Sequence, residues 1–160
     1  VIFCENKLLY DTKGTVPEEH YSIPLGQADI KRTGEDVTIV AMSRMVLVAL
    51  EAADELASRG IESEVVDLRS LSPWDERTLV ESIEKTGRLV VIDEDNPRCS
   101  IASDVAALAA TQALPYLDAP VSMITPPHTP VPISPPQEDF YVPDAARVVT
   151  NVESMFATTS

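Results

Sequence analysis

Cysteine and histidine are scarce in this sequence of 160 residues, which contains two of each. Cys4 and Cys99 lie far apart, without the C-x-x-C spacing of a zinc or redox site, so neither a metal centre nor a disulfide framework is predicted. His20 and His128 have no cysteines near them in the sequence, which also argues against a metal site. This sparing use of cysteine favours a reducing, cytoplasmic compartment.

Glycine motifs and long apolar runs are also absent. None of the five glycines builds G-x-G-x-x-G or G-x-x-x-x-G-K-[ST], so nucleotide binding is not predicted. The apolar run at 90–92 followed by Asp93 and Glu94 has the form of a nucleotidase magnesium element, but its phosphate loop is missing. No apolar run approaches the roughly 20 residues that cross a bilayer, so we expect no membrane insertion.

Basic residues are few. The sequence has 12 basic and 26 acidic residues, which gives a net charge of −14. Such a surface repels a phosphate backbone, so nucleic acid is not an expected partner. The excess of acid favours solubility as its explanation, and a second interpretation is that an acidic face steers a basic protein partner.

The first residue is Val and not Met, and no signal-peptide pattern precedes the apolar stretch 1–5. We therefore expect the chain to begin in mid-protein, with a short buried strand at 1–5. Residues 1–34 are interpreted as the end of a preceding domain and an interdomain connector. Residues 35–156 are predicted to form one α/β domain, and residues 157–160 a frayed tail.

Strands and helices alternate through that domain. Apolar runs predict strands at 37–41, 64–68, 88–93 and 121–124. Two helices are expected to end at a glycine: the first runs from Met45 to Gly60 and the second from Ser72 to Gly87. Two more are predicted by apolar stripes and begin near Ser100 and near Asp144. The second helix has Ser72 as its predicted N-cap, Pro73 at its first position and Asp75 in its first turn. The two later stripes are Ile101, Val105, Leu108 and Gln112, and then Ala145, Val148, Val149, Val152 and Phe156.

This alternation predicts a three-layer α/β/α sandwich with a mostly parallel five-stranded sheet. In such sheets ligands meet the carboxyl ends of the strands. The site loops are therefore expected at 67–70, 93–99 and 125–129. The proline-dense loop 126–136 is expected to be a rigid packing surface at a subunit or domain interface.

These loops hold no self-sufficient catalytic set. Cys99 lies where a helix start and Arg98 favour a thiolate, but no histidine is paired with it, and an unreactive thiol is the favoured interpretation. His128 is interpreted first as a structural hydrogen-bonding residue, and second as a group projecting toward a neighbouring active site. No catalytic, cofactor-binding or metal-binding residue is predicted in this chain.

Several motifs together resemble one family, the beta subunits of thiamine-diphosphate-dependent 2-oxo acid and acetoin dehydrogenases. Residues 5–10, 16–19 and 23–26 are similar to the segment that joins the two domains of those subunits, and residues 36–40, 66–73 and 128–132 to later signatures. Residues 4–7 and 94–99 are most similar to the acetoin branch.

The resemblance implies a transketolase-type C-terminal domain within an alpha2-beta2 heterotetramer. Its implied partners are the alpha subunit, a second beta subunit and the basic subunit-binding domain of a dihydrolipoyl acyltransferase. Thiamine diphosphate and magnesium would be bound by polypeptide outside this chain, so the isolated chain is expected to be inactive and to bind neither.

A loop close to the active site or an interface is expected to contain Glu94, Asn96, Arg98 and Cys99, with His128 nearby. Glu94 would orient backbone, while Arg98 would pair either with a carboxylate across the subunit boundary or with a local one. Two alternatives stay open: a stand-alone, non-catalytic interaction module, and a fragment of another transketolase-like enzyme.

Overall fold

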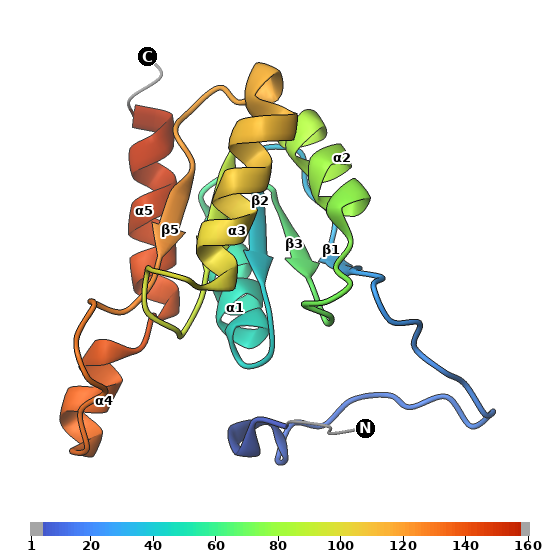
Figure 1. Ribbon diagram of the computed structural model, residues 1–160, viewed down its shortest axis with the longest axis vertical. Helices are drawn as coiled ribbons and strands as arrows, with labels where there is room; N and C mark the ends of the chain where they lie inside the picture. The colour runs from blue at the N-terminus through green and yellow to red at the C-terminus, as the bar shows by residue number, and fades with distance from the viewer. Residues whose placement is uncertain (1–4, 158–160) are drawn as a thin grey trace.

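A five-stranded, mostly parallel sheet forms the centre of the computed structural model, which describes residues 5–157 (Figure 1). The strand order is β1-β3-β2-β4-β5, with β1 antiparallel to β3 and the other neighbours parallel. This confirms the predicted fold class. The strands are β1 (Asp29–Arg32), β2 (Val37–Ala41), β3 (Ser63–Asp67), β4 (Leu89–Ile92) and β5 (Ser122–Ile124).

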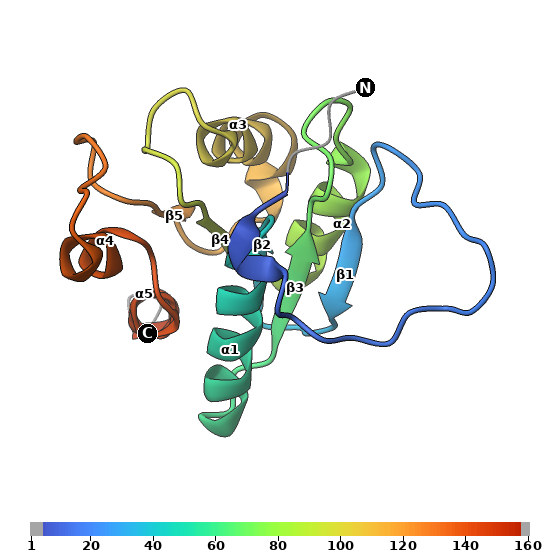
Figure 2. The same cartoon turned by 90° about the horizontal axis from the view of Figure 1, so that it is seen from below.

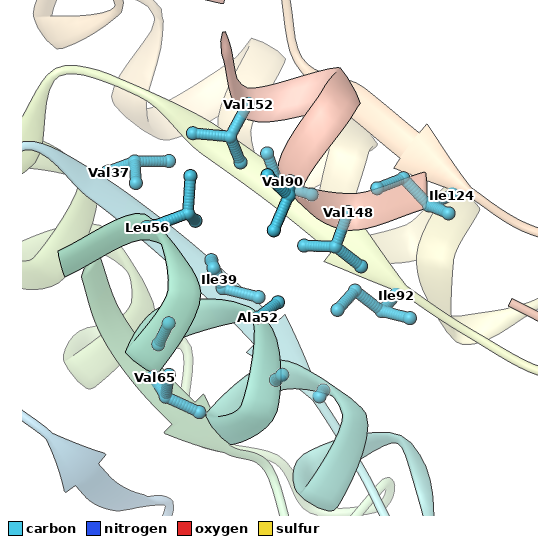
Figure 3. Packing of buried hydrophobic residues seen from close by; sticks show 14 of the residues in the cluster. Val37, Ile39, Ala52, Leu56, Val65, Val90, Ile92, Ile124, Val148 and Val152 are labelled. Atoms are coloured by element: carbon cyan, nitrogen blue, oxygen red, sulfur yellow. The ribbon is translucent and has the colours of Figure 1, made fainter. Parts of the chain in front are cut away.

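Helices cover both faces of the sheet, as the view from below shows (Figure 2). One face packs against α1 (Met45–Ser58) and α5 (Ala145–Ala157), and the other against α2 (Glu76–Thr86) and α3 (Ile101–Leu108). Alternate residues of each strand serve the two layers: Ile39 joins the α1 and α5 core, and Val40 the opposite one. Figure 3 shows side chains of the first core converging from both helices and the sheet.

The interior strands β2 and β4 are buried along their whole length, because helices cover both of their faces. The first helix ends as predicted, with Gly60 left-handed at a φ of +82°. The second also ends as predicted, at a left-handed Gly87.

The strand β1 was missed by the sequence analysis, which placed residues 29–32 in the connector. Its burial is low because it is an edge strand, and three of its four residues are charged, so it carries no apolar run. The 3-10 helix η1 (Lys7–Leu9) also lies in the connector. Of the strand predicted at 1–5, residues 1–4 lie outside the described part of the chain, and Glu5 has no regular structure.

The predicted N-cap of α2 was wrong. The cap is Asp75 and not Ser72, because the Asp75 carboxylate accepts the N–H of Thr78 at 3.1 Å. Asp75 also accepts the N–H of Ala28 at 3.1 Å, and so fixes the approach to β1. The helix consequently begins later than Pro73.

The prediction for Gln112 was also wrong. After α3 the chain continues as a π-helical turn η2 (Ala109–Ala113) and a 3-10 turn η3 (Leu114–Tyr116). The wider turn shifts the inward face by one residue, so Ala113 is buried while Gln112 is exposed and bonds to Glu76.

The C-terminal part contains one unexpected helix, α4 (Pro135–Tyr141), at the end of the proline-dense segment. The last helix, α5, begins where predicted and buries Val148, Val149 and Val152, with Met155 in addition. Ala157 is the final residue of α5, and the rest of the predicted tail, 158–160, lies outside the described residues. No helix in the range 5–157 is long and apolar enough to cross a membrane.

Candidate functional site

The carboxyl ends of four parallel strands meet at one edge of the sheet, the lower edge in Figure 1. Among residues 5–157, three that are not glycine have left-handed backbones, and all three lie in the loops at this edge: Ser43 (φ 53°), Arg69 (φ 55°) and Cys99 (φ 54°). Such conformations cost free energy and concentrate at functional sites. This edge is therefore the candidate site.

The loop after β4 is anchored by a buried carboxylate. Asp93, which is 5% exposed, accepts the N–H of Asp95 at 3.0 Å and the N–H of Ala102 at 3.4 Å. The second bond satisfies one of the free donors at the start of α3. The helix begins near Ser100, as predicted, and Ser100 is its N-cap, whose N–H donates to the Ser103 hydroxyl at 3.2 Å. The loop is thus fixed at both ends.

Within the loop, side chains bind nearby backbone. Asp95 accepts the N–H of Asn96 at 2.7 Å, and Asn96 Oδ1 accepts the N–H of Arg98 at 3.0 Å. Asn96 Oδ1 also lies 3.1 Å from His128 Nδ1. Because the amide oxygen can only accept, this pair requires the tautomer with hydrogen on Nδ1. The structure thus brings together two predicted site residues from different loops.

A contact that the sequence analysis missed joins the connector to the same loop. Asn6 Nδ2 donates to Glu94 Oε1 at 3.2 Å across a sequence separation of 88 residues. The Asn6 side chain also caps η1 by accepting the N–H of Leu8. No pattern in the sequence signals this pairing, since a hydrogen bond between two partly buried polar side chains far apart in the chain leaves no periodic trace.

Arg98 and Cys99 lie at the end of the loop, directly before the N-cap of α3, and both are exposed. Arg98 forms no ion pair with any residue in the described range. Cys99 is a free thiol. Their side chains are therefore available to another surface.

A second polar cluster lies where β3 ends. Lys31 pairs with Asp29 at 2.7 Å, and Arg69 also pairs with Asp29. Both cations lie just under 4 Å from Asp67. The hydrogen bond from Lys31 lowers the pKa of Asp29, whereas burial raises the pKa of Asp67 against the opposing effect of the Arg69 N–H. Only Asp67 to Ser70 had been expected here, because β1 had not been recognised.

The residues of this edge suit binding better than bond making. Among the described residues, no three His, Cys, Asp or Glu side chains gather as a metal site. His128 bonds to an amide and to no hydroxyl or thiol, so it has no nucleophile to activate at this edge. The loop after β4 presents an exposed guanidinium and an exposed thiol on a backbone that is fixed at both ends.

A sheet of this topology, with helices on both faces and its polar loops gathered at the carboxyl edge, defines an open α/β domain. The particular family follows from comparison with known proteins. The family described as the transketolase C-terminal domain matches residues 26–148, and this chain belongs to it.

Curated relatives at high identity are beta subunits. Acetoin:2,6-dichlorophenolindophenol oxidoreductase subunit beta of Bacillus subtilis (strain 168) is 57% identical over 150 residues, which is 94% of this chain and 44% of the relative. The Cupriavidus necator protein of the same name is also 57% identical, over 92% of this chain and 44% of its own length. Pyruvate dehydrogenase E1 component subunit beta of Bacillus subtilis is 45% identical over 84% of this chain and 42% of its own length. The chain thus spans less than half the length of these relatives.

Solved structures agree on the fold. A chain titled split gene transketolase, inactive beta4 tetramer, superposes with a TM-score of 0.74 at 30% identity, covering 91% of this chain and 48% of that chain. A transketolase mutant from Pichia stipitis matches at a TM-score of 0.56 and 12% identity over 81% of this chain and 17% of its own, which supports the fold alone.

Proposed function

We propose that this chain is the C-terminal domain of the beta subunit of a thiamine-diphosphate-dependent dehydrogenase that acts on acetoin. The observation that carries the proposal is the 57% identity to two acetoin oxidoreductase beta subunits, against 45% or less to the pyruvate and 2-oxoisovalerate relatives. A 2-oxo acid such as pyruvate is the related substrate class.

The cofactor and its magnesium ion belong, in this proposal, to polypeptide outside the chain. When bound, thiamine diphosphate would supply the nucleophilic chemistry at the carbonyl carbon of the substrate. Magnesium is bound through carboxylates and phosphate oxygens, and the described residues offer no three-acid cluster for it. The isolated chain is accordingly proposed to be inactive.

In this proposal the domain contributes by holding side chains of the loop after β4 in place, and it supplies no catalytic group. The loop after β4 is held by Asp93 within the sheet and by Asn6 from the connector, so it presents Arg98 in a defined place. Defined placement of a charged side chain is what a subunit boundary or the rim of an active site requires. We propose the alpha subunit and a second beta subunit as the partners that meet this edge.

A further proposed partner is the basic subunit-binding domain of a dihydrolipoyl acyltransferase. The net charge of −14 supports electrostatic attraction of a basic domain. Such binding is expected to weaken strongly between low and physiological salt, which surface plasmon resonance measures. Binding that does not change with salt argues against this partner.

The test is turnover by the full-length alpha and beta pair with thiamine diphosphate and magnesium. Acetoin-dependent reduction of 2,6-dichlorophenolindophenol is expected, with lower activity on pyruvate. The 160-residue chain alone, under the same conditions, is the control and should give none. Turnover by that chain alone, or no activity of the pair on acetoin or any 2-oxo acid, contradicts the proposal.

A second candidate is a subunit of a split transketolase, which the solved structure at 30% identity favours. Ketol transfer between sugar phosphates by the assembled subunits, in the absence of acetoin turnover, would establish it. The higher identity of the dehydrogenase relatives makes it the second choice.

A further inference from the structure

The 3-10 helix η1 is joined to the body of the domain by one side-chain hydrogen bond. Asn6 Nδ2 donates to Glu94 Oε1 at 3.2 Å, and the two side chains are partly buried. Within the range 5–157, no other hydrogen bond and no ion pair joins residues 5–25 to the residues that follow them. The polar attachment of η1 therefore depends on a single pair of side chains.

The stretch of connector between η1 and β1 gives this attachment little support. Every residue from Tyr10 to Leu25 is exposed. Figures 1 and 2 show the stretch running away from the sheet and returning to it at β1, while η1 lies beyond the carboxyl edge. A segment with so few buried contacts opens at a low cost in free energy. The tether also keeps η1 close to its place after opening, so the bond can form again.

The acceptor, Glu94, is the first residue of the loop after β4, and this loop is held from a second side as well. Asn96 Oδ1 lies 3.1 Å from His128 Nδ1 and accepts the N–H of Arg98 at 3.0 Å. At the end of the loop, Cys99 has a left-handed backbone with a φ of 54°. A residue other than glycine keeps that conformation only where its surroundings hold it. The bonds at Glu94 and Asn96 thus restrain the backbone that carries Arg98.

We infer that η1 is a latch on the loop after β4. In the closed state Asn6 holds Glu94, and Arg98 is presented in one place. In the open state η1 is released and the loop moves more freely. A single hydrogen bond contributes little net free energy, so the two states lie close in free energy and a small change at the connector shifts their populations. With residues 1–34 interpreted as an interdomain connector, a movement of the preceding domain would reach Arg98 through the latch.

Asn6→Asp opens the latch and leaves η1 capped. The new carboxylate can still accept the N–H of Leu8, as Asn6 Oδ1 does, but it has no N–H to donate and it repels Glu94. The measurement is hydrogen–deuterium exchange followed by mass spectrometry on the intact protein. Exchange of the backbone amides of residues 94–98 is expected to rise about tenfold. Exchange in the peptide that covers β4 should not change, because the sheet keeps its hydrogen bonds.

A reversed bond is the decisive control. Glu94→Gln alone keeps an oxygen that accepts from Asn6, so exchange of residues 94–98 should stay within about threefold of wild type. When Glu94→Gln is combined with Asn6→Asp, the amide at position 94 can donate to the carboxylate at position 6. The bond is then restored with donor and acceptor exchanged, and exchange should return to within about threefold of wild type.

Gln137→Glu is the matched control for the added negative charge. Gln137 is exposed on α4, and its substitution changes the net charge by the same amount as Asn6→Asp. Exchange of residues 94–98 should be the same in this variant as in wild type. A rise equal to that of Asn6→Asp would assign the effect to charge alone and would overturn the latch.

Two further results would overturn it, apart from an Asn6→Asp variant whose loop exchanges as slowly as wild type. One is a double variant that exchanges as fast as Asn6→Asp alone, because the effect then does not run through the bond to Glu94. The other is an equally large rise in the peptide that covers β4, which indicates a general loss of stability. None of these readouts uses a substrate or a partner subunit, so the latch and the proposed function are tested separately.

Discussion

The carboxylate of Asp93 accepts the backbone N–H of Ala102, and this bond ties the end of β4 to the first turn of α3. The same buried side chain holds the N–H of Asp95. One residue therefore sets where the loop 94–99 leaves the sheet and where it enters the helix.

Replacing Asp93 by Ala should destabilise the domain by about 2 kcal/mol, because two backbone donors lose their acceptor in a site closed to water. Urea unfolding followed by circular dichroism measures the change. Asp104→Ala is the control, since Asp104 is an exposed carboxylate on the same helix, and it should cost less than about 0.5 kcal/mol. Equal costs for the two variants would show that Asp93 does not anchor the loop.

Arg98→Ala, in the assembled alpha and beta enzyme, should lower activity or the amount of assembled complex by about tenfold, as expected when one partner of a charge pair across a boundary is removed. Steady-state turnover and sedimentation velocity measure the two quantities. Arg77→Ala removes an equally charged side chain whose partner is Glu81 on the same helix, and should change neither. Normal turnover and normal assembly of the Arg98 variant would refute its role at a boundary.

Asp67→Asn should stabilise the domain at neutral pH and have little effect at pH 3. Burial raises the pKa of Asp67 in the folded state, so its contribution to stability is greatest below the unfolded value of 3.8 and is lost as pH rises through the folded value. The amide keeps an acceptor for the Arg69 N–H but carries no charge to desolvate. Unfolding free energies measured from pH 3 to 7 should diverge as pH rises, and parallel curves would contradict the assignment.

Glu64 and Lys85 should show strong coupling. Glu64, 1% exposed on β3, accepts a bond from the Ser82 hydroxyl at 2.6 Å and pairs with Lys85. Lys85→Met should cost about 3 kcal/mol because it leaves a buried carboxylate without its cation. Adding Glu64→Gln should recover part of that loss, since the neutral amide needs no cation. A double-mutant cycle by thermal unfolding tests this, and additive effects would count against it.

Gly34→Ala should destabilise the domain by about 2 kcal/mol or more, because its Cβ would lie 2.3 Å from the backbone carbon of Ser63 and backbone cannot rotate away. Gly14→Ala is the matched control, with nothing within 4 Å of its added Cβ. It should be close to neutral in the same unfolding assay. Similar stabilities would mean that β3 shifts to accommodate the methyl group.

The sequence predicted best those helices and strands whose side chains are fully buried or whose end requires a glycine. The strand Leu89–Ile92 and the helix ending before Gly60 were predicted well, because a fully covered strand needs an unbroken apolar run and a left-handed stop needs glycine. The edge strand Asp29–Arg32 was not, since its residues are mostly charged and its pairing with β3 depends on tertiary structure.

Two residues near the start of α2 were both plausible N-caps from the sequence. Both Ser72 and Asp75 are good capping residues, and the structure uses Asp75, whose carboxylate accepts the N–H groups of Thr78 and Ala28. For the site, topology correctly placed the loops at the carboxyl edge. The bonds between Asn6 and Glu94 and between Asn96 and His128 join polar side chains over long sequence separations, which no periodicity records.

Both outer strands of the sheet are built in a way that discourages fibre formation. On β1, Asp29 and Lys31 place opposite charges along the open side, and β5 is only three residues long. The Arg147 guanidinium donates a hydrogen bond to the carbonyl oxygen of Thr125, the residue immediately after β5, at 3.2 Å. A short strand offers an incoming chain few backbone groups, and charged side chains on an edge oppose its approach, so edge-to-edge pairing through β1 or β5 is disfavoured.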